Sequence, residues 1–150
     1  MADGVFNIAK GKVAYYHDIV ANNEVAAAEL HIVLLTVDQA DGTLEDHDDL
    51  AALLAAANTE AAFGSYARQV LGDADLTASS DNGTLRIAPL PVVTWSSATT
   101  GTTMTKLLVC YAPTNGSADS AIIPLTHHDF TPTTDGSDLV TIAGTYFDAT

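Results

Sequence analysis

Histidine and carboxylate side chains cluster at one place where they could bind a metal ion or transfer protons. His127, His128 and Asp129 are consecutive and form the densest histidine site of the chain. Neighbouring residues of a strand point to opposite faces of a sheet, so this pair is not a ready chelate for one ion. We predict surface or interface histidines. A small metal-dependent enzyme or binder built on these three residues is the less favoured alternative.

A second candidate is the acidic run around His47, which spans positions 45–49. Consecutive residues of a helix point around its axis, so few of these side chains can converge on one cation. Carboxylates at a helix start are stabilised by free backbone N–H groups and by the helix dipole. We therefore predict that Thr43 caps a helix whose first turn holds these acids. Capping and a solvated face explain the run, and we expect neither a metal nor a cofactor.

Other residues that could do chemistry lack the pattern that chemistry needs. Ser65 has no second glycine for a nucleophile elbow, and the chain has no phosphate-binding glycine loop. His31 lies in an apolar stretch, where we predict a hydrogen bond in the core. Cys110 is the single cysteine, and we predict a buried hydrophobic side chain. We expect no catalytic residues and a protein that is not an enzyme.

Charge narrows the range of partners. The chain of 150 residues has 19 acidic and 5 basic side chains, which gives a formal net charge of −14. Such a surface repels phosphate backbones and anionic lipids, so we expect neither a nucleic acid nor a membrane as partner. Hydrophobic residues make up 47% of the chain, which is typical of a folded domain rather than a disordered acidic tail. The apolar runs are too short to cross a bilayer, and residues 1–4 do not resemble the start of a signal peptide.

Residues up to about Leu71 favour helices. Apolar residues at alternating steps of three and four predict one helix that ends near Asn22 and Asn23. Its stripe consists of Phe6, Ala9, Val13, Tyr16 and Val20. The β-branched, apolar stretch Glu29–Val37 predicts a buried strand. We also expect Thr59 to cap a short helix.

After Leu71 the sequence favours strands separated by turns, and prolines indicate edges or bends. The expected strands are Leu85–Trp95, Met104–Tyr111, Ala121–Thr126 and Leu139–Phe147, and the prolines are Pro89, Pro91 and Pro124. The predicted fold class is α+β, with N-terminal helices and a mainly antiparallel β-sheet or sandwich in the C-terminal half. We expect one domain over residues 1–150, helix-rich in 1–71 and strand-rich in 72–150.

Several segments, in order along nearly the entire chain, resemble small virion structural proteins of tailed bacteriophages that infect high-GC bacteria. These segments are Val5–Val13, Asp48–Leu71, Lys106–Pro113, Ile122–Phe130 and Thr133–Leu139. None is a chemical signature by itself, and their shared order carries the resemblance. It implies a non-enzymatic role, many copies on the particle and a symmetric oligomer. It supplies no catalytic residues.

The charge favours a position outside the shell, because a protein at −14 would be repelled inside a DNA-filled head. We expect a capsid decoration protein that stabilises the shell by bridging subunits, in a virion assembled in the host cytoplasm. Its partners would be the major capsid protein and copies of itself, with a trimer favoured. The alternative is a tail tube, terminator or adaptor subunit that stacks through Ser96–Gly101 or Pro113–Ser117.

The N-terminal segment is the first candidate for the capsid or oligomer contact. Its apolar stripe lies beside Lys10 and Lys12, cations that an acidic protein could use against an acidic shell. The predicted interface residues are Val5, Phe6, Ile8, Lys10, Lys12, Val13 and Tyr16. An ordinary core-facing helix with solvated lysines is the competing interpretation.

Overall fold

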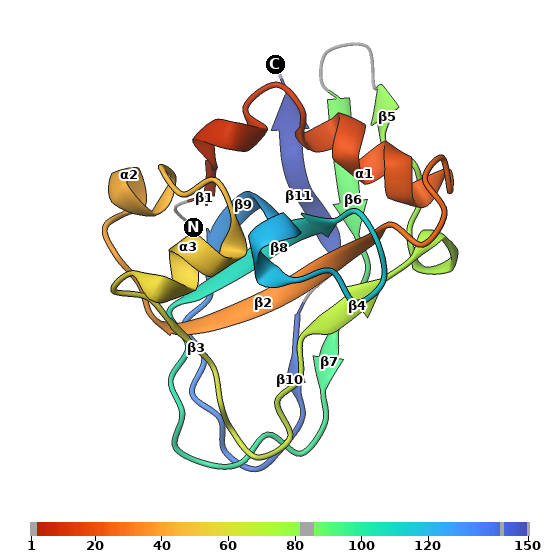
Figure 1. Ribbon diagram of the computed structural model, residues 1–150. Helices are drawn as coiled ribbons and strands as arrows, with labels where there is room; N and C mark the ends of the chain where they lie inside the picture. The colour runs from red at the N-terminus through yellow and green to blue at the C-terminus, as the bar shows by residue number, and fades with distance from the viewer. Residues whose placement is uncertain (1–2, 82–85, 142, 150) are drawn as a thin grey trace.

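The computed structural model describes residues 3–81, 86–141 and 143–149 and has the predicted α+β architecture (Figure 1). Its α-helices are α1 (Val13–Ala21), α2 (Asp41–Leu44) and α3 (Leu50–Ala55), and its 3-10 helices are η1 (Asn7–Ala9), η2 (Asp73–Asp75) and η3 (Asp119–Ala121). Among the described residues, no helix has the length and apolar character needed to span a membrane.

The largest sheet, sheet A, has six strands and only antiparallel pairs. Its order is β1, β9, β8, β2 and β3, with β4 also paired to β2. The strands are β1 (Asp3–Val5), β2 (Glu29–Val37), β3 (Thr59–Glu60), β4 (Gln69–Leu71), β8 (Lys106–Ala112) and β9 (Ile123–Asp129). The prediction for β2 is confirmed at both ends.

The C-terminal half adds two smaller sheets. Sheet B has the order β11 (Gly144–Ala149), β6 (Arg86–Leu90) and β5 (Ser80–Asp81), and sheet C pairs β7 (Thr94–Trp95) with β10 (Leu139–Val140). Two expected long strands are therefore each divided in two, and Leu85, the expected start of the first, lies outside the described residues. Pro89 and Pro124 stand next to register shifts, as expected of residues that cannot donate a ladder hydrogen bond.

The core is centred on β2 and β8. Leu30 to Leu35 of β2 are all buried, because the strand has partners along both edges and apolar layers on both faces. All residues of β8 are buried as well. Burial on both faces explains why neither strand alternates apolar with polar residues.

The predicted first helix is interrupted. Gly11 has a φ of +75°, a conformation that glycine adopts without strain, so the chain ends η1 there and starts α1 at Val13. The predicted end near Asn22 is confirmed. Helix α1 lies where the sheets meet: the ring of Tyr16 packs on Tyr111 of β8 at 4.7 Å, and His17 contacts Tyr146 of β11.

Two predicted helix caps are wrong. Asp49, and not Thr43, caps α3, since its carboxylate accepts a hydrogen bond of 2.8 Å from the backbone N–H of Ala52. Thr43 instead lies inside the short helix α2. Thr59 begins strand β3, where pairing with Val37 of β2 outweighs the local preference for a helix.

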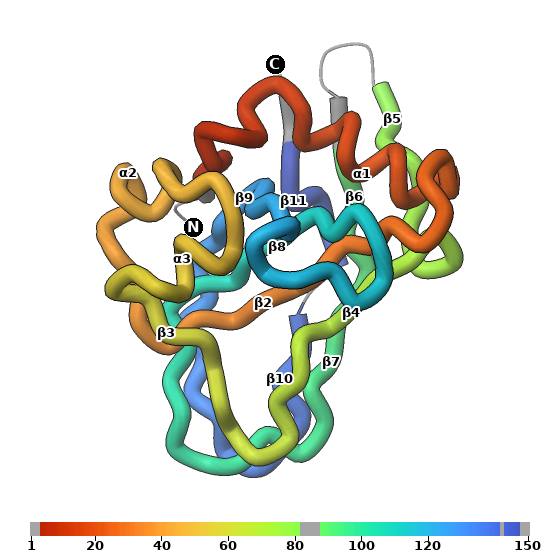
Figure 2. Tube along the Cα trace, viewed as in Figure 1, coloured from red at the N-terminus to blue at the C-terminus, as the bar shows by residue number. Residues whose placement is uncertain are grey.

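Three loops meet at the end of the molecule opposite α1 (Figures 1 and 2). They comprise residues 61–68, 96–105 and 130–138. Ala98 N–H donates to Ser137 O at 3.0 Å, Gly136 N–H donates to Ala98 O at 2.9 Å, and Gly64 N–H donates to Thr99 Oγ1 at 2.9 Å. These hydrogen bonds hold the loops to one another, and we call this end the loop tip.

Strand β1 approaches β9 so closely that only glycine fits at its centre. A Cβ atom on Gly4 would overlap the ring of His127 and lie 2.6 Å from Glu45 Oε1. The next residues are also fixed, because Phe6 N–H donates to Leu125 O at 3.1 Å and Asn7 N–H donates to Glu45 O at 2.9 Å. The N-terminal segment is therefore held along β9 before η1 begins.

Candidate functional site

The predicted interface residues of the N-terminal segment separate into buried and exposed groups. Phe6 and Val13 are fully buried, and Val5 and Tyr16 are partly buried against the core. Phe6 and Val13 therefore belong to the protein's own core, as the competing interpretation of a core-facing stripe has it, and they are not accessible as interface residues. Ile8, Lys10 and Lys12 remain exposed, and Tyr15 of the same segment is 61% exposed. We call the exposed set Ile8, Lys10, Lys12 and Tyr15 the N-terminal surface.

Two other cations are engaged with carboxylates. The guanidinium of Arg68 bonds Glu60 through Nε at 2.8 Å and Nη2 at 2.7 Å, and its Nη atoms also bond Asp119. The hydrogen bond from Arg68 lowers the pKa of Asp119. This network ties the loop between β3 and β4 to η3.

Lys106 is buried in β8 and lies between two carboxylates. Its Nζ is 2.8 Å from Asp41 Oδ1 and 2.5 Å from Asp129 Oδ1. Burial alone would lower the pKa of Lys106, but the hydrogen bonds and charges of Asp129 and Asp41 raise it above the ordinary value. Lys106 is therefore a charged structural residue with little surface to offer a partner.

Lys10 and Lys12 differ from these two cations in exposure. The side chain of Lys10 is 60% exposed, with its Nζ 3.8 Å from Glu45 Oε2, and Lys12 is exposed. Of the four cations whose side chains the structure describes, only these two are exposed. Among the cations whose side chains are described, the accessible positive charge is therefore concentrated on the N-terminal surface.

The paired histidines are buried, which corrects the prediction that they lie at the surface. His127 is 1% exposed; its Nε2 is 3.2 Å from Glu45 Oε1, and its ring meets Phe6 edge to face. His128 is 8% exposed, with Nε2 2.9 Å from Thr126 Oγ1. The two rings occupy different environments, as predicted for adjacent strand residues. His127 supports the N-terminal segment, and His128 faces sheet B.

The acidic run also has structural contacts. Asp49 caps α3, Asp46 accepts a hydrogen bond from Asn7, and His47 Nε2 lies 2.9 Å from Gln39 Oε1. His31 is buried and bonds Glu29 at 3.3 Å, in line with the predicted core hydrogen bond. Cys110 is fully buried, as predicted, and burial raises the pKa of its thiol. Within the described ranges, no group of three or more His, Cys, Asp and Glu side chains is arranged to hold a metal ion.

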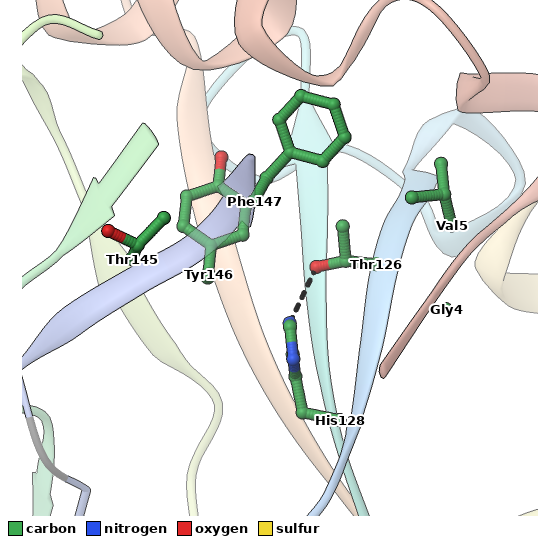
Figure 3. A pocket seen from close by; sticks show the side chains of 7 residues that line it. All are labelled: Gly4, Val5, Thr126, His128, Thr145, Tyr146 and Phe147. Carbon is green, nitrogen blue, oxygen red and sulfur yellow. Dashed lines mark hydrogen bonds between the residues drawn. The ribbon is translucent and has the colours of Figure 1, made fainter. Parts of the chain in front are cut away.

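Two cavities of about 240 and 260 Å³ lie between sheet A and sheet B and share His128, Thr145 and Tyr146 as lining residues. Figure 3 shows the first of them. The first cavity extends toward Val5 of β1 and Phe147 of β11. The second is lined further by Leu90, Leu107, Asp129, Phe130, Val140, Thr141 and Gly144. We call these two adjoining cavities together the β9–β11 groove.

A buried hydrogen-bond chain holds one wall of this groove. His17 Nε2 is 2.8 Å from Thr77 O, so that nitrogen donates, and Nδ1 of the neutral ring accepts from Tyr146 Oη at 3.1 Å. Burial lowers the pKa of His17, which favours the neutral ring. Burial likewise raises the pKa of Tyr146. These hydrogen bonds therefore fix the Tyr146 side chain between α1 and the groove.

The sequence did not point to Thr145 or Tyr146. Both fall in a stretch that was expected to be a strand, but nothing in that stretch indicates which edge of a sheet it occupies. The pairing with β6 joins residues more than 50 positions apart, and this contact decides that Thr145 faces a groove.

The chain matches no protein-family model, no curated protein and no solved structure. The N-terminal surface and the β9–β11 groove are two features of the described residues that are accessible to a partner.

Proposed function

We propose that this protein is a non-enzymatic structural protein of a bacteriophage virion, namely a decoration protein on the outer surface of the head. It would stabilise the shell by bridging neighbouring capsid subunits. The observation that carries the proposal is the N-terminal surface, where Lys10 and Lys12 lie in the same short segment as exposed Ile8 and Tyr15 on an otherwise acidic protein. The resemblance of five ordered segments to phage virion proteins supports the same role.

Electrostatics indicates which side of the protein would face the shell. The net charge of −14 opposes contact with DNA inside the head, so an outer position is favoured. The two lysines are the accessible cations of the described side chains, and they would orient the N-terminal surface toward an acidic shell. Ile8 and Tyr15 would add apolar contact at the same place. The protein would occupy the shell in many copies and as a symmetric oligomer, with a trimer favoured. The oligomer would multiply the weak contact that each subunit makes.

The proposal is tested by neutralising both lysines. Shells assembled from the major capsid protein of the same phage are mixed with the protein and sedimented, while light scattering gives the mass of the free protein. We expect a discrete small oligomer that sediments with shells. The double variant Lys10→Gln, Lys12→Gln should bind about tenfold more weakly, because it loses the local attraction.

A matched control changes the net charge by the same amount elsewhere. Thr43→Glu with Ala55→Glu places two negative charges at exposed positions of α2 and α3. This control should bind nearly as well as the unsubstituted protein. Equal binding by the lysine variant and the unsubstituted protein would rule out the N-terminal surface as the anchor.

The loop tip favours a second candidate function, a tail component. Its loops project from the end opposite α1 and are fastened by backbone hydrogen bonds between residues 96–105 and 130–138 (Figure 1). Loops of this kind can stack one ring of subunits on the next. Electron microscopy of particles labelled on this protein separates the two functions: label on the head supports decoration, and label along the tail supports the tail component.

A further inference from the structure

The β9–β11 groove has the dimensions of an extended chain. One side is lined by Thr126 and His128, which are alternate residues of β9 and so share one face, and by Phe130, which directly follows the strand. Four residue steps at about 3.3 Å per residue give this row a length of about 13 Å. The opposite side is lined by consecutive residues of β11, from Gly144 to Phe147. Figure 3 shows the two strands on opposite sides of the cavity.

The wall formed by β11 is a strand edge. Among the described residues β11 pairs only with β6, and the groove lies along its other side. An edge strand presents backbone N–H and C=O groups that another strand can pair with. The structure therefore combines a backbone edge for hydrogen bonds with a row of side-chain positions for packing.

The lining favours an uncharged occupant. Phe130, Leu107 and Val140 make the wider end of the groove apolar, and Val140 is 46% exposed there. The charged side chain in the lining, Asp129, is paired with Lys106. A charged side chain entering this end would lose hydration against the apolar part of the lining. Alternating apolar and small side chains would fit the pleat.

We propose that the β9–β11 groove binds an extended, uncharged segment of a capsid subunit, which pairs with the free edge of β11 as an added strand. The inference rests on the proposed function and names the contact that would accompany the N-terminal surface. Lys10 follows Val5 of the groove by five residues, so the two features are within about 17 Å of each other along the chain. The closeness of the groove to the N-terminal surface along the chain favours the capsid subunit as the occupant, and a second copy of this chain is the outcome that would contradict it.

A cross-link identifies the occupant. Ala143 is exposed and directly precedes Gly144 of the groove without lining either cavity, while the single cysteine, Cys110, is fully buried. The variant Ala143→Cys therefore offers one accessible thiol beside the groove for a benzophenone maleimide, and the unsubstituted protein is the control for labelling. Irradiation on shells should join the labelled variant to an uncharged segment of the capsid subunit. A cross-link to a second copy of this chain would overturn the proposal.

Hydrogen exchange tests the added strand. On shells, the backbone amides of Gly144–Phe147 should exchange at least tenfold more slowly than in the free protein, because a new strand covers them. Unchanged exchange on bound shells would overturn strand addition.

A blocked groove distinguishes this proposal from the proposed function. Thr145→Arg should weaken shell binding at least tenfold, whereas Thr43→Arg, the same change at an exposed threonine of α2, should not. Equal binding by both variants and the unsubstituted protein would overturn the groove as the site but leave decoration standing. If the unsubstituted protein itself ignores shells, decoration fails, and this inference fails with it. Melting temperatures confirm that both variants fold.

Discussion

Strands β8 and β11 are both antiparallel, but they have opposite surroundings. β8 pairs with β2 along one edge and β9 along the other, and all its residues are buried. β11 pairs with β6 alone in the described part of the chain, and Thr145 is exposed beside the groove. Backbone groups that are paired on both sides stabilise the fold but are not available to a partner. β8 therefore contributes to the stability of the fold, whereas the unpaired side of β11 is the edge on which the proposed capsid contact depends.

The largest expected effect comes from the closed side. Leu108 is fully buried at the centre of β8, so Leu108→Ala removes apolar contacts and leaves a cavity. We expect a loss of about 2–5 kcal/mol in the free energy of unfolding, measured by denaturant titration. The matched change on the open side, Val140→Ala at a 46% exposed position, should cost no more than about 0.5 kcal/mol. Similar losses at both positions would contradict the division between the two sides.

The Arg68 network should contribute less. Arg68→Met keeps most of the side-chain volume and removes the bonds to Glu60 and Asp119. We expect a loss of about 1–2 kcal/mol, since charged hydrogen bonds are lost but the Asp119 side chain is 37% exposed and screened by solvent. The pKa of Asp119 is lowered in the folded state. Its stabilising effect is therefore present above the unfolded pKa of about 3.9 and is lost as the pH falls through the lower folded pKa.

Acid titration of Arg68→Met checks this contribution. The difference in unfolding free energy between the variant and the unsubstituted protein should shrink as the pH is lowered below about 4. A difference that stays constant down to pH 2 would show that Asp119 does not contribute through its charge.

The smallest expected effect concerns His17, because its hydrogen bond holds Tyr146 at the open side. The pKa of His17 is lowered by burial, so the unfolded chain binds a proton more readily than the folded one. The stability due to neutral His17 is present above the unfolded pKa of about 6.5 and is lost as the pH falls below it. The slope from this one group is at most about 1.4 kcal/mol per pH unit.

Melting temperatures between pH 7.5 and 5 measure this effect. The unsubstituted protein should lose stability faster on acidification than His17→Gln, which can still bond Thr77 and Tyr146 but does not titrate. Parallel curves for the two proteins would exclude His17 as the source of the slope. The other histidines are present in both proteins, so their contributions cancel in the comparison.

Parts of the fold could be predicted because local chemistry decides them. The run Glu29–Val37 is apolar enough to require burial on both faces, and it forms β2 with the expected ends. Cys110 and His31 are buried as expected from their apolar neighbours. The first helix ends near Asn22 as expected, whereas Gly11, with its positive φ, divides the predicted segment.

Other features depend on contacts between distant residues. The residues from Thr59 onward are typical of a helix start, but Thr59 pairs with β2. The burial of His127 follows from the N-terminal segment, which pairs with β9 and places Phe6 edge to face against the ring. The β9–β11 groove requires β11 to pair with β6 and to face β9, and no local pattern contains that information. The sequence therefore led to the N-terminal surface but not to the groove.

Gly4 has a consequence for how this sequence can change during evolution. Because any side chain at position 4 would overlap the His127 ring and approach Glu45, these positions constrain one another. Among related sequences, glycine at position 4 should accompany a large ring at position 127, and a side chain at position 4 should appear only with a smaller residue there. Positions 4 and 127 are thus expected to covary. Such covariation would indicate that distant relatives also pair β1 with β9.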